Sequence, residues 1–200
     1  LAWIIALAAS SATTVTAVAL AYLTYQNGVI SYQMGGWAPP WGIEYVVDTA
    51  NAFILLLVSS IATIVLIYSP ASVAKEIRPG RGHLYYCMYV LCLTGLLGIA
   101  ITGDAFNVFV FLEVSSLSSY ALIAMGRQRK ALTAAFQYLV MGTIGATFFL
   151  IGVGLLYMMT GSLNMYDIAQ RLSGVSNTRT IKTAFAFFAL GIGIKMAMFP

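Results

Sequence analysis

Charged side chains are scarce in this 200-residue sequence, which has ten Lys or Arg and six Asp or Glu, together 8% of the chain. Soluble domains carry about 25% charged residues and expose most of them to water. So few charges cannot cover the surface of a soluble protein in which 60% of the residues are hydrophobic. Disorder is also excluded, because a chain this apolar would collapse in water. The composition predicts an integral membrane protein.

Cysteine and histidine are equally rare, with two Cys and one His. Two cysteines exclude a disulfide scaffold or a four-cysteine metal site. Cys87 and Cys92 fall on different helix faces, and His83 beside Arg81 is typical of an interfacial anchor. The sequence has no phosphate loop, dinucleotide fingerprint, haem or iron–sulfur spacing, or Ser-His-Asp set. We therefore expect no cofactor and no metal site. The basic residues form no stripe that would indicate a nucleic-acid partner.

Long apolar runs dominate what is present, and a helix needs about 20 such residues to cross a bilayer. The predicted fold class is all-α, a polytopic transmembrane helix bundle forming one domain over residues 1–200. The predicted spans are Ala2–Tyr25, Val46–Tyr68, His83–Ile101, Asp104–Met125, Leu132–Met159 and Ile181 to the end of the chain. Because the sequence starts at Leu1 without an initiator Met and stops at Pro200, we expect it to be the N-terminal part of a longer chain, truncated at both ends.

Basic residues gather in two of the predicted connections. Residues 70–82 hold three Lys or Arg and one Glu, and residues 127–130 hold three basic residues and no acid. The positive-inside rule places these two loops in the cytoplasm and the loop with Trp37 and Trp41 outside. We therefore expect a multi-pass protein of the inner cell membrane.

Glu113 is one of two charged residues predicted to lie deep in the membrane. It is nine residues beyond Asp104, which is about 14 Å along a helix and close to the bilayer midplane. An ionised carboxylate there costs at least about 2.5–3.5 kcal/mol. Such a Glu could exchange protons if a cationic partner moves, or it could make a structural helix–helix hydrogen bond in its protonated form. We favour the first interpretation.

Lys195 is the second deep charge, about 21 Å along a helix that starts at Ile181. Gly191 and Gly193 precede it and Pro200 follows it, a pattern typical of an interrupted membrane helix. Such interruptions are tolerated only where they are buried in protein or line a polar cavity. A desolvated lysine can lose its proton near neutral pH. The alternative is that Lys195 reaches to the far headgroups.

Three polar residues are candidates for supporting roles. Asn107 and Ser116 lie six and three positions from Glu113, so they could hydrogen-bond it or hold water. Small hydroxyls equally serve close helix packing, which is also the interpretation of the glycines in the fifth span. Asp104 follows Gly103 at a predicted helix start and is expected to cap that helix.

The segment 103–120, GDAFNVFVFLEVSSLSSY, resembles the fifth-helix signature of the antiporter-like subunits of respiratory complex I, membrane-bound hydrogenases and Mrp-type sodium/proton antiporters. Within that family the segment is most similar to the D subunit of Mrp antiporters. The resemblance covers about residues 48–200 and continues in three further segments, 137–147, 154–165 and 193–200. The last of these looks like the start of the family's broken seventh helix.

The resemblance implies roles for both deep charges. Glu113 matches the family's buried glutamate and Lys195 the lysine that takes up and releases a proton, and their changing attraction is thought to gate proton movement. Gln137 stands where many members carry Lys, which departs from the pattern. The family has about fourteen helices in two inverted repeats. This sequence holds only the beginning of the first repeat, so we do not expect it to conduct protons alone.

The leading hypothesis is a proton-translocating subunit of a multisubunit membrane complex, either a cation/proton antiporter or an energy-converting redox complex of the NADH:quinone oxidoreductase type. The expected partners are other membrane subunits, the lipid bilayer, protons and, for an antiporter, sodium. Any electron carriers would reside on other chains. Two alternatives remain. A secondary solute transporter would need more polar groups in the first three spans, and a non-translocating scaffold would tolerate replacement of Glu113 and Lys195.

Overall fold

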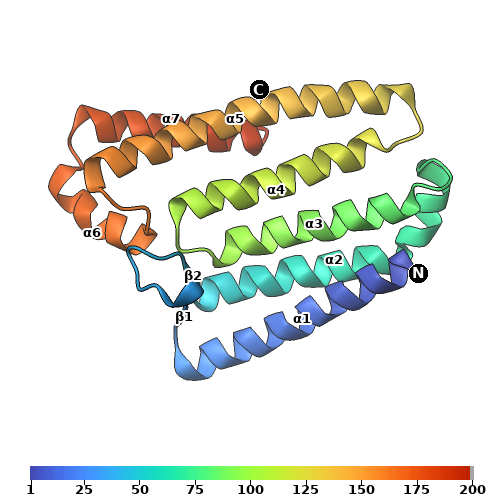
Figure 1. Ribbon diagram of the computed structural model, residues 1–200, viewed down its shortest axis with the longest axis horizontal. Helices are drawn as coiled ribbons and strands as arrows, with labels where there is room; N and C mark the ends of the chain where they lie inside the picture. The colour runs from blue at the N-terminus through green and yellow to red at the C-terminus, as the bar shows by residue number, and fades with distance from the viewer. Residues whose placement is uncertain (199–200) are drawn as a thin grey trace.

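The computed structural model describes residues 1–198, and these residues form a layer of long helices with a small hairpin at one end. The elements are α1 Ala2–Asn27, β1 Ile30–Gln33, the short 3-10 turn η1 Met34–Gly36, β2 Glu44–Val47, α2 Thr49–Glu76, α3 Gly82–Ile101, α4 Ala105–Ala124, α5 Arg129–Thr160, α6 Met165–Val175 and α7 Arg179–Lys195. Helices α1 to α5 lie side by side in chain order, and α7 lies against α5 (Figure 1). The hairpin and α6 cover the same end of the layer.

Five helices, α1 to α5, are long and apolar enough to cross a membrane. This confirms the predicted all-α, multi-spanning fold class. The sixth predicted span is wrong in its extent, because α7 has 17 residues and ends at Lys195. The chain turns there: Ala197 has a positive φ of 51°, and the amide of Met198 donates to the carbonyl of Gly193 at 3.0 Å. The end of that predicted span, residues 199–200, lies outside the described residues.

The second span also differs from its prediction, which ended it at Tyr68 because Ser69-Pro70 follows. Helix α2 instead runs through Pro70 to Glu76. A proline has no N–H to donate to the carbonyl four residues earlier, here that of Leu66. That carbonyl accepts from the Ser69 hydroxyl at 2.9 Å and from the indole N–H of Trp3 at 2.8 Å. The helix therefore continues without an unsatisfied acceptor.

The connections consequently differ from the predicted loops. Only residues 77–81 separate α2 from α3, and the first two residues of α5 belong to the predicted basic segment 127–130. Arg127 joins the two connections, since its guanidinium donates to the carbonyls of Ala74 and Ile77 at 3.1 and 2.9 Å. The basic side chains thus lie at helix ends and in short, fixed turns.

The opposite end of the layer is tied together by the hairpin. The antiparallel strands β1 and β2 pair over four residues each. Gly103, just before α4, donates its amide to the carbonyl of Glu44 at 2.8 Å, and the Asn164 amide group donates to the Glu44 carboxylate at 2.9 Å. Backbone bonds between residues 103–105 and 163–165 complete the link. The starts of α4 and α6 are therefore fixed to one another and to the hairpin.

Glycines allow α5 and α7 to approach closely. A Cβ on Gly191 would lie 2.7 Å from the carbonyl oxygen of Gly145 and 2.8 Å from the amide nitrogen of Phe149. The predicted packing role of the α5 glycines is confirmed here. Toward the hairpin end, α4, α5, α6 and α7 share an apolar core that includes Phe149, Val153 and Ile181.

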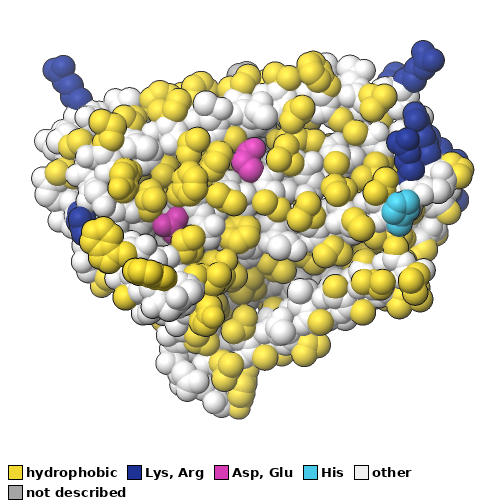
Figure 2. Space-filling view, in the orientation of Figure 1, with side chains coloured by type: hydrophobic (Ala, Val, Ile, Leu, Met, Phe, Trp, Pro, Cys, Tyr) yellow, Lys and Arg dark blue, Asp and Glu magenta, His cyan; other side chains and the backbone are white. Residues whose placement is uncertain are grey.

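On the face shown in Figure 2, basic side chains lie apart from the apolar side chains, whereas acidic side chains lie among them. Lys and Arg side chains lie at the two ends of the layer, with the larger group beside the connections α2–α3 and α4–α5, while hydrophobic side chains spread over the flank between them (Figure 2). Large apolar residues such as Ile61 and Phe136 are more than half exposed. Such a surface fits lipid or neighbouring membrane helices.

Candidate functional site

An ion pair links the middle of α4 to the end of α7. The Lys195 Nζ lies 2.9 Å from Glu113 Oε1 and donates to it, although the two residues are 82 positions apart in the sequence. Lys195 is the last residue of α7 and Glu113 lies eight residues into α4. The carbonyls at a helix C-terminus carry partial negative charge, which further favours an ammonium group there. The structure thus brings together the two charges that the sequence predicts deep in the membrane.

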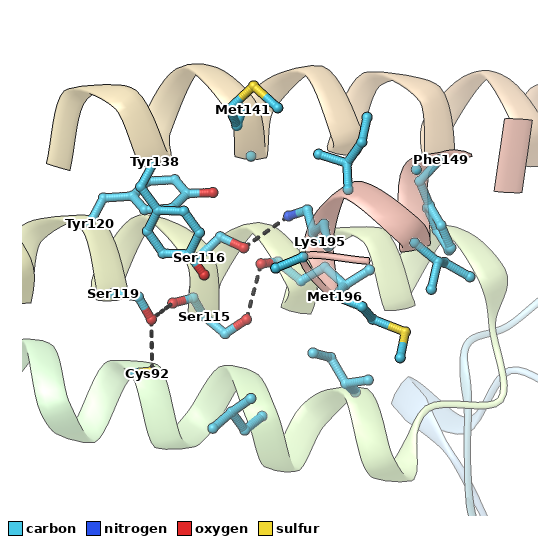
Figure 3. Close-up of a pocket in the computed structure, with 18 residues that line it drawn as sticks. Cys92, Ser115, Ser116, Ser119, Tyr120, Tyr138, Met141, Phe149, Lys195 and Met196 are labelled. Carbon is cyan, nitrogen blue, oxygen red and sulfur yellow. Dashed lines mark hydrogen bonds between the residues drawn. The ribbon is translucent and has the colours of Figure 1, made fainter. Parts of the chain in front are cut away.

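Ser116 completes the coordination of the ammonium group. Its Oγ accepts a hydrogen bond from Lys195 Nζ at 2.8 Å (Figure 3). Ser116 lies three residues after Glu113 on α4, so the two acceptors are neighbours on one helix face. The predicted supporting role of Ser116 is therefore directed to the lysine rather than to the glutamate. Side-chain exposure is 14% for Lys195 and 24% for Glu113, so both charged side chains are only partly buried.

A cavity of about 530 Å³ opens beside the ion pair, between α3, α4, α5 and α7. Lys195 and Ser116 line it, together with the phenol rings of Tyr120 and Tyr138 and the hydroxyl of Ser119. Figure 3 shows the two tyrosine rings next to Ser116 on the side away from Phe149. Its volume gives room for several waters, each of which takes about 30 Å³ in the liquid. A protonatable amine therefore faces a cavity that can hold water.

The other two candidate residues serve the start of α4. The carboxylate of Asp104 accepts from the backbone amide of Asn107 at 2.7 Å, which makes Asp104 the helix cap that the sequence predicts. The Asn107 side chain donates to the Thr102 hydroxyl at 3.0 Å. The expectation that Asn107 faces Glu113 is thus not met: its amide is committed to the preceding turn, two helical turns from the ion pair.

Tyr120, Tyr138 and Gly142 are among the lining residues that the sequence did not assign to the site. Tyr138 and Gly142 are one turn apart on α5, and Tyr120 is one turn beyond Ser116 on α4. The sequence feature that could have indicated them is the i, i+4 spacing of Tyr138 and Gly142. This spacing places a tyrosine and a glycine without a side chain next to one another on one helix face. Which neighbouring helix fills the space beside the glycine depends on tertiary packing.

The structure shows no group of three or more His, Cys, Asp or Glu able to hold a metal within residues 1–198. Cys87 and Cys92 are free thiols, and Cys92 lies 3.4 Å from the Ser119 hydroxyl at the edge of the cavity. The polar groups that meet at the site are an amine, a carboxylate and hydroxyls.

The fold and the site define a polytopic membrane protein with a Lys–Glu ion pair beside a cavity that Lys195 lines. Residues 102–200 match the family model described as NADH:quinone oxidoreductase/Mrp antiporter, TM. The chain belongs to this family of antiporter-like membrane subunits.

Relatives from two kinds of complex match almost the whole chain. The N subunit of NADH-quinone oxidoreductase from Desulforudis audaxviator is 44% identical over 92% of the chain, and the D subunit of the Na(+)/H(+) antiporter from Alkalihalophilus pseudofirmus is 31% identical over 90%. The solved Mrp complex from Dietzia sp. contains a chain that superposes with a TM-score of 0.85 at 29% identity, covering 98% of this chain and 36% of that one. The chain spans about 36% of the length of both curated relatives. The sequence resemblance named both kinds of complex and pointed most closely to the D subunit of Mrp antiporters, whereas of these two relatives the N subunit of the oxidoreductase is the more similar.

Proposed function

We propose that this chain forms part of a proton-translocating subunit of a multisubunit membrane complex, and that the Glu113–Lys195 pair is its proton switch. The observation that carries the proposal is the 2.9 Å contact between Lys195 Nζ and Glu113 Oε1 beside a cavity. Relatives named as subunits of a Na(+)/H(+) antiporter and of NADH-quinone oxidoreductase support it.

The switch works through charge. While the Glu113 carboxylate lies against the amine, it stabilises the protonated form of Lys195 because an ammonium in a low-dielectric setting needs a counter-charge. When α7 moves away from α4, the ammonium loses that counter-charge and its proton becomes easier to release. Helix α7 ends at Lys195 and the chain turns at residues 196–198, so the required movement would act on the last turn of this helix.

The charge distribution supports an orientation in the inner cell membrane with the basic connections 77–81 and 125–128 in the cytoplasm and the hairpin outside. Glu113 and Lys195 then lie near the middle of the bilayer. A proton taken up from one side would reach Lys195, and the rest of the translocation path would be supplied by the other parts of the complex.

Two kinds of complex fit the proposal, and they differ in what drives the proton. A cation/proton antiporter would exchange protons for sodium, whereas a redox complex would couple translocation to electron transfer on other chains. The partners proposed for the chain in either case are further membrane subunits, which would cover the apolar flank, together with the lipid bilayer.

The test is proton translocation by the full-length subunit within its assembled complex, reconstituted in vesicles with a pH-sensitive dye. Glu113→Ala and Lys195→Ala are each expected to lower the rate by at least about a hundredfold, a typical contribution of a positioned proton-transfer group. Adding sodium or, separately, NADH to the same vesicles identifies the driving reaction.

Lys182→Ala is the matched control, because Lys182 is a lysine near the start of the same helix, away from the ion pair. It is expected to translocate at the wild-type rate. If the Glu113 and Lys195 variants assemble and also keep the wild-type rate, the pair is structural and the scaffold alternative holds.

A further inference from the structure

A second cavity, of about 590 Å³, lies at the end of the layer that bears the basic connections. It is lined by residues from the last turn of α2 and the first turns of α5, with the end of the α4–α5 connection between them. Figure 1 shows that the connections α2–α3 and α4–α5 meet at this end. The volume is within the range of about 300–1,000 Å³ that is usual for sites that bind small molecules. This cavity is separate from the one beside the ion pair.

The lining of the cavity carries an excess of positive charge. Lys75, Arg127 and Lys130 contribute three cations and Glu76 one carboxylate, so three minus one leaves a net charge of +2. Within the described part of the chain, residues 1–198, none of these three cations forms an ion pair with a carboxylate. Cations held around one cavity repel each other, and an anion placed between them removes that repulsion.

The guanidinium of Arg127 is held in place by the end of α2. Its Nε donates to the carbonyl of Ile77 at 2.9 Å and its Nη2 to the carbonyl of Ala74 at 3.1 Å. A guanidinium has five N–H donors in one plane, so three remain free for other acceptors. This planar arrangement suits two oxygens of a phosphate better than a lysine ammonium does. The orientation of the group is therefore set before any ligand binds.

The start of α5 adds to the positive potential of the cavity. The cap residue Gln128 makes no side-chain hydrogen bond to the helix, and the first turn holds Arg129 and Lys130 but no acidic residue. The first amides of a helix lack acceptors within it and carry partial positive charge, which basic side chains there do not offset. An anion in the cavity would compensate for both contributions.

The position of the cavity favours a lipid as the source of that anion. Helices α2 and α5 are both long and apolar enough to cross a membrane, and the cavity lies at the end of both. Ala131 and Ala134 continue its lining along α5, and Leu132 and Phe136 on the same helix are more than half exposed. A phospholipid shows the same succession of a charged phosphate followed by apolar chains. Basic pockets between membrane helices are known to bind anionic headgroups.

From these observations we propose that this cavity binds the phosphodiester headgroup of an anionic phospholipid. Arg127 contacts the phosphate oxygens through its free N–H donors, while Lys75 and Lys130 supply further positive charge. An acyl chain follows Ala131 and Ala134 along α5. Glu76 weakens binding by its like charge. A zwitterionic lipid such as phosphatidylcholine is excluded by the repulsion of its own cation. The site does not rest on the proposed function of the ion pair.

The test is photo-crosslinking from the cavity wall in the full-length subunit assembled in its complex. Gln128→p-azidophenylalanine places the photoreactive group there, at an exposed residue without a side-chain contact to the helix start. The vesicles contain equal amounts of phosphatidylglycerol and phosphatidylcholine with the same acyl chains. After irradiation, the mass of the subunit shows which lipid is attached. Phosphatidylglycerol adducts are expected to predominate.

Lys75→Gln combined with Lys130→Gln is expected to lower the ratio of phosphatidylglycerol to phosphatidylcholine adducts by about 25-fold. Each basic residue near an anionic lipid contributes about fivefold to binding, and two such contributions multiply. The matched control is Arg179→Gln with Lys182→Gln, which removes two basic residues from the start of α7. Its ratio should equal that of the wild type. An unchanged ratio in the first variant, or an equal loss in the control, would overturn the proposal.

Glu76→Gln guards against a variant that merely misfolds. Removing the one carboxylate of the lining is expected to raise the ratio about fivefold, and a misfolded subunit would not gain selectivity. A ratio that stays constant or falls in this variant would contradict the proposed site. None of these readouts involves proton movement, so they are judged separately from the Glu113 and Lys195 variants.

Two further outcomes would assign the cavity to another occupant. Inorganic phosphate, added at millimolar concentration, should leave the phosphatidylglycerol adducts in place, because the acyl chains also hold the lipid. Loss of the adducts would identify free phosphate as the ligand and overturn the lipid assignment. Crosslinks to a neighbouring subunit without lipid adducts would show that a protein segment fills the cavity, which also overturns it.

Discussion

The hydroxyl of Tyr120 occupies the space that a side chain at position 142 would need. A Cβ on Gly142 would lie 1.7 Å from the Tyr120 oxygen and 2.7 Å from the ring carbon that bears it. Helices α4 and α5 therefore meet through a tyrosine on one and a glycine on the other. The position of the phenol beside Ser116 and Lys195 depends on this fit.

Gly142→Ala is expected to destabilise the subunit by about 1–3 kcal/mol, because the added methyl must displace the buried Tyr120 ring. The measurement is thermal unfolding of the purified complex in detergent, followed by the fluorescence of the subunit or its loss from the assembly. Gly154→Ala is the control on the same helix, since a Cβ there meets nothing within 4 Å. That variant should be neutral or more stable, because alanine favours a helix over glycine by up to about 1 kcal/mol. Equal melting temperatures for the two variants would contradict the fit.

Gly191→Ala is expected to separate α7 from α5 and to displace Lys195 from Glu113. Its Cβ would approach backbone atoms of α5 to 2.7–2.8 Å, which cannot move as a flexible side chain would. Translocation should fall by at least about tenfold, since a small displacement of a reacting group is enough to disturb transfer. The rate is measured in the vesicle assay.

Gly193→Ala on the same helix provides the comparison, because it has open space around its Cβ position. It should retain the wild-type rate. If both glycine variants lose activity equally, general helix flexibility rather than the α5–α7 contact accounts for the loss.

Asp104→Ala is expected to lower stability by about 1 kcal/mol, within the usual range for loss of a helix cap. The amide of Asn107 then loses the acceptor that it has at 2.7 Å. Asp104→Ser should restore most of the stability, because a serine oxygen can cap the same amide. The rate of translocation per assembled complex should stay unchanged in both variants. A specific loss of rate without loss of stability would instead give Asp104 a part in proton transfer.

The stabilisation of α6 by Asp167 and its partner Arg171 should change with pH only under acidic conditions. The Ser162 hydroxyl and then the Arg171 guanidinium hold the pKa of Asp167 below its usual range. A carboxylate with a lowered pKa in the folded state stabilises the fold above its unfolded pKa of about 3.9, and this contribution is lost as pH falls through the folded value. Limited proteolysis near residues 165–175 should therefore be constant from pH 8 down to about 5 and increase only below about 4. Asp167→Asn should abolish this acid-dependent change; a transition near neutral pH would contradict the assignment.

The two charged residues and the helix cap of the candidate site could be predicted from the sequence, because each follows from its position within its own predicted helix. The cost of placing a charge in hydrocarbon singles out Glu113 and Lys195, because almost every other charge falls near the end of an apolar run. The cap at Asp104 follows from a short acidic side chain at a helix start. The partner of Asn107 was not predicted, because only Glu113 was considered from the sequence and the folded turn before α4 instead brings its amide to Thr102.

Apolar runs long enough for a bilayer determined by themselves that this chain is a helical membrane protein, because the bilayer requires backbone hydrogen bonds to be made within each segment. The ends of these segments were decided by tertiary contacts: Trp3 and Ser69 satisfy the carbonyl that Pro70 leaves free, so α2 continues. The pairing of Glu113 with Lys195 was likewise set by packing, since residues 82 positions apart meet only where glycines let α5 and α7 come together. Sequence periodicity records which face of a helix is polar. The partner of that face, and the cavity left beside it, arise from the shapes of all the helices at once.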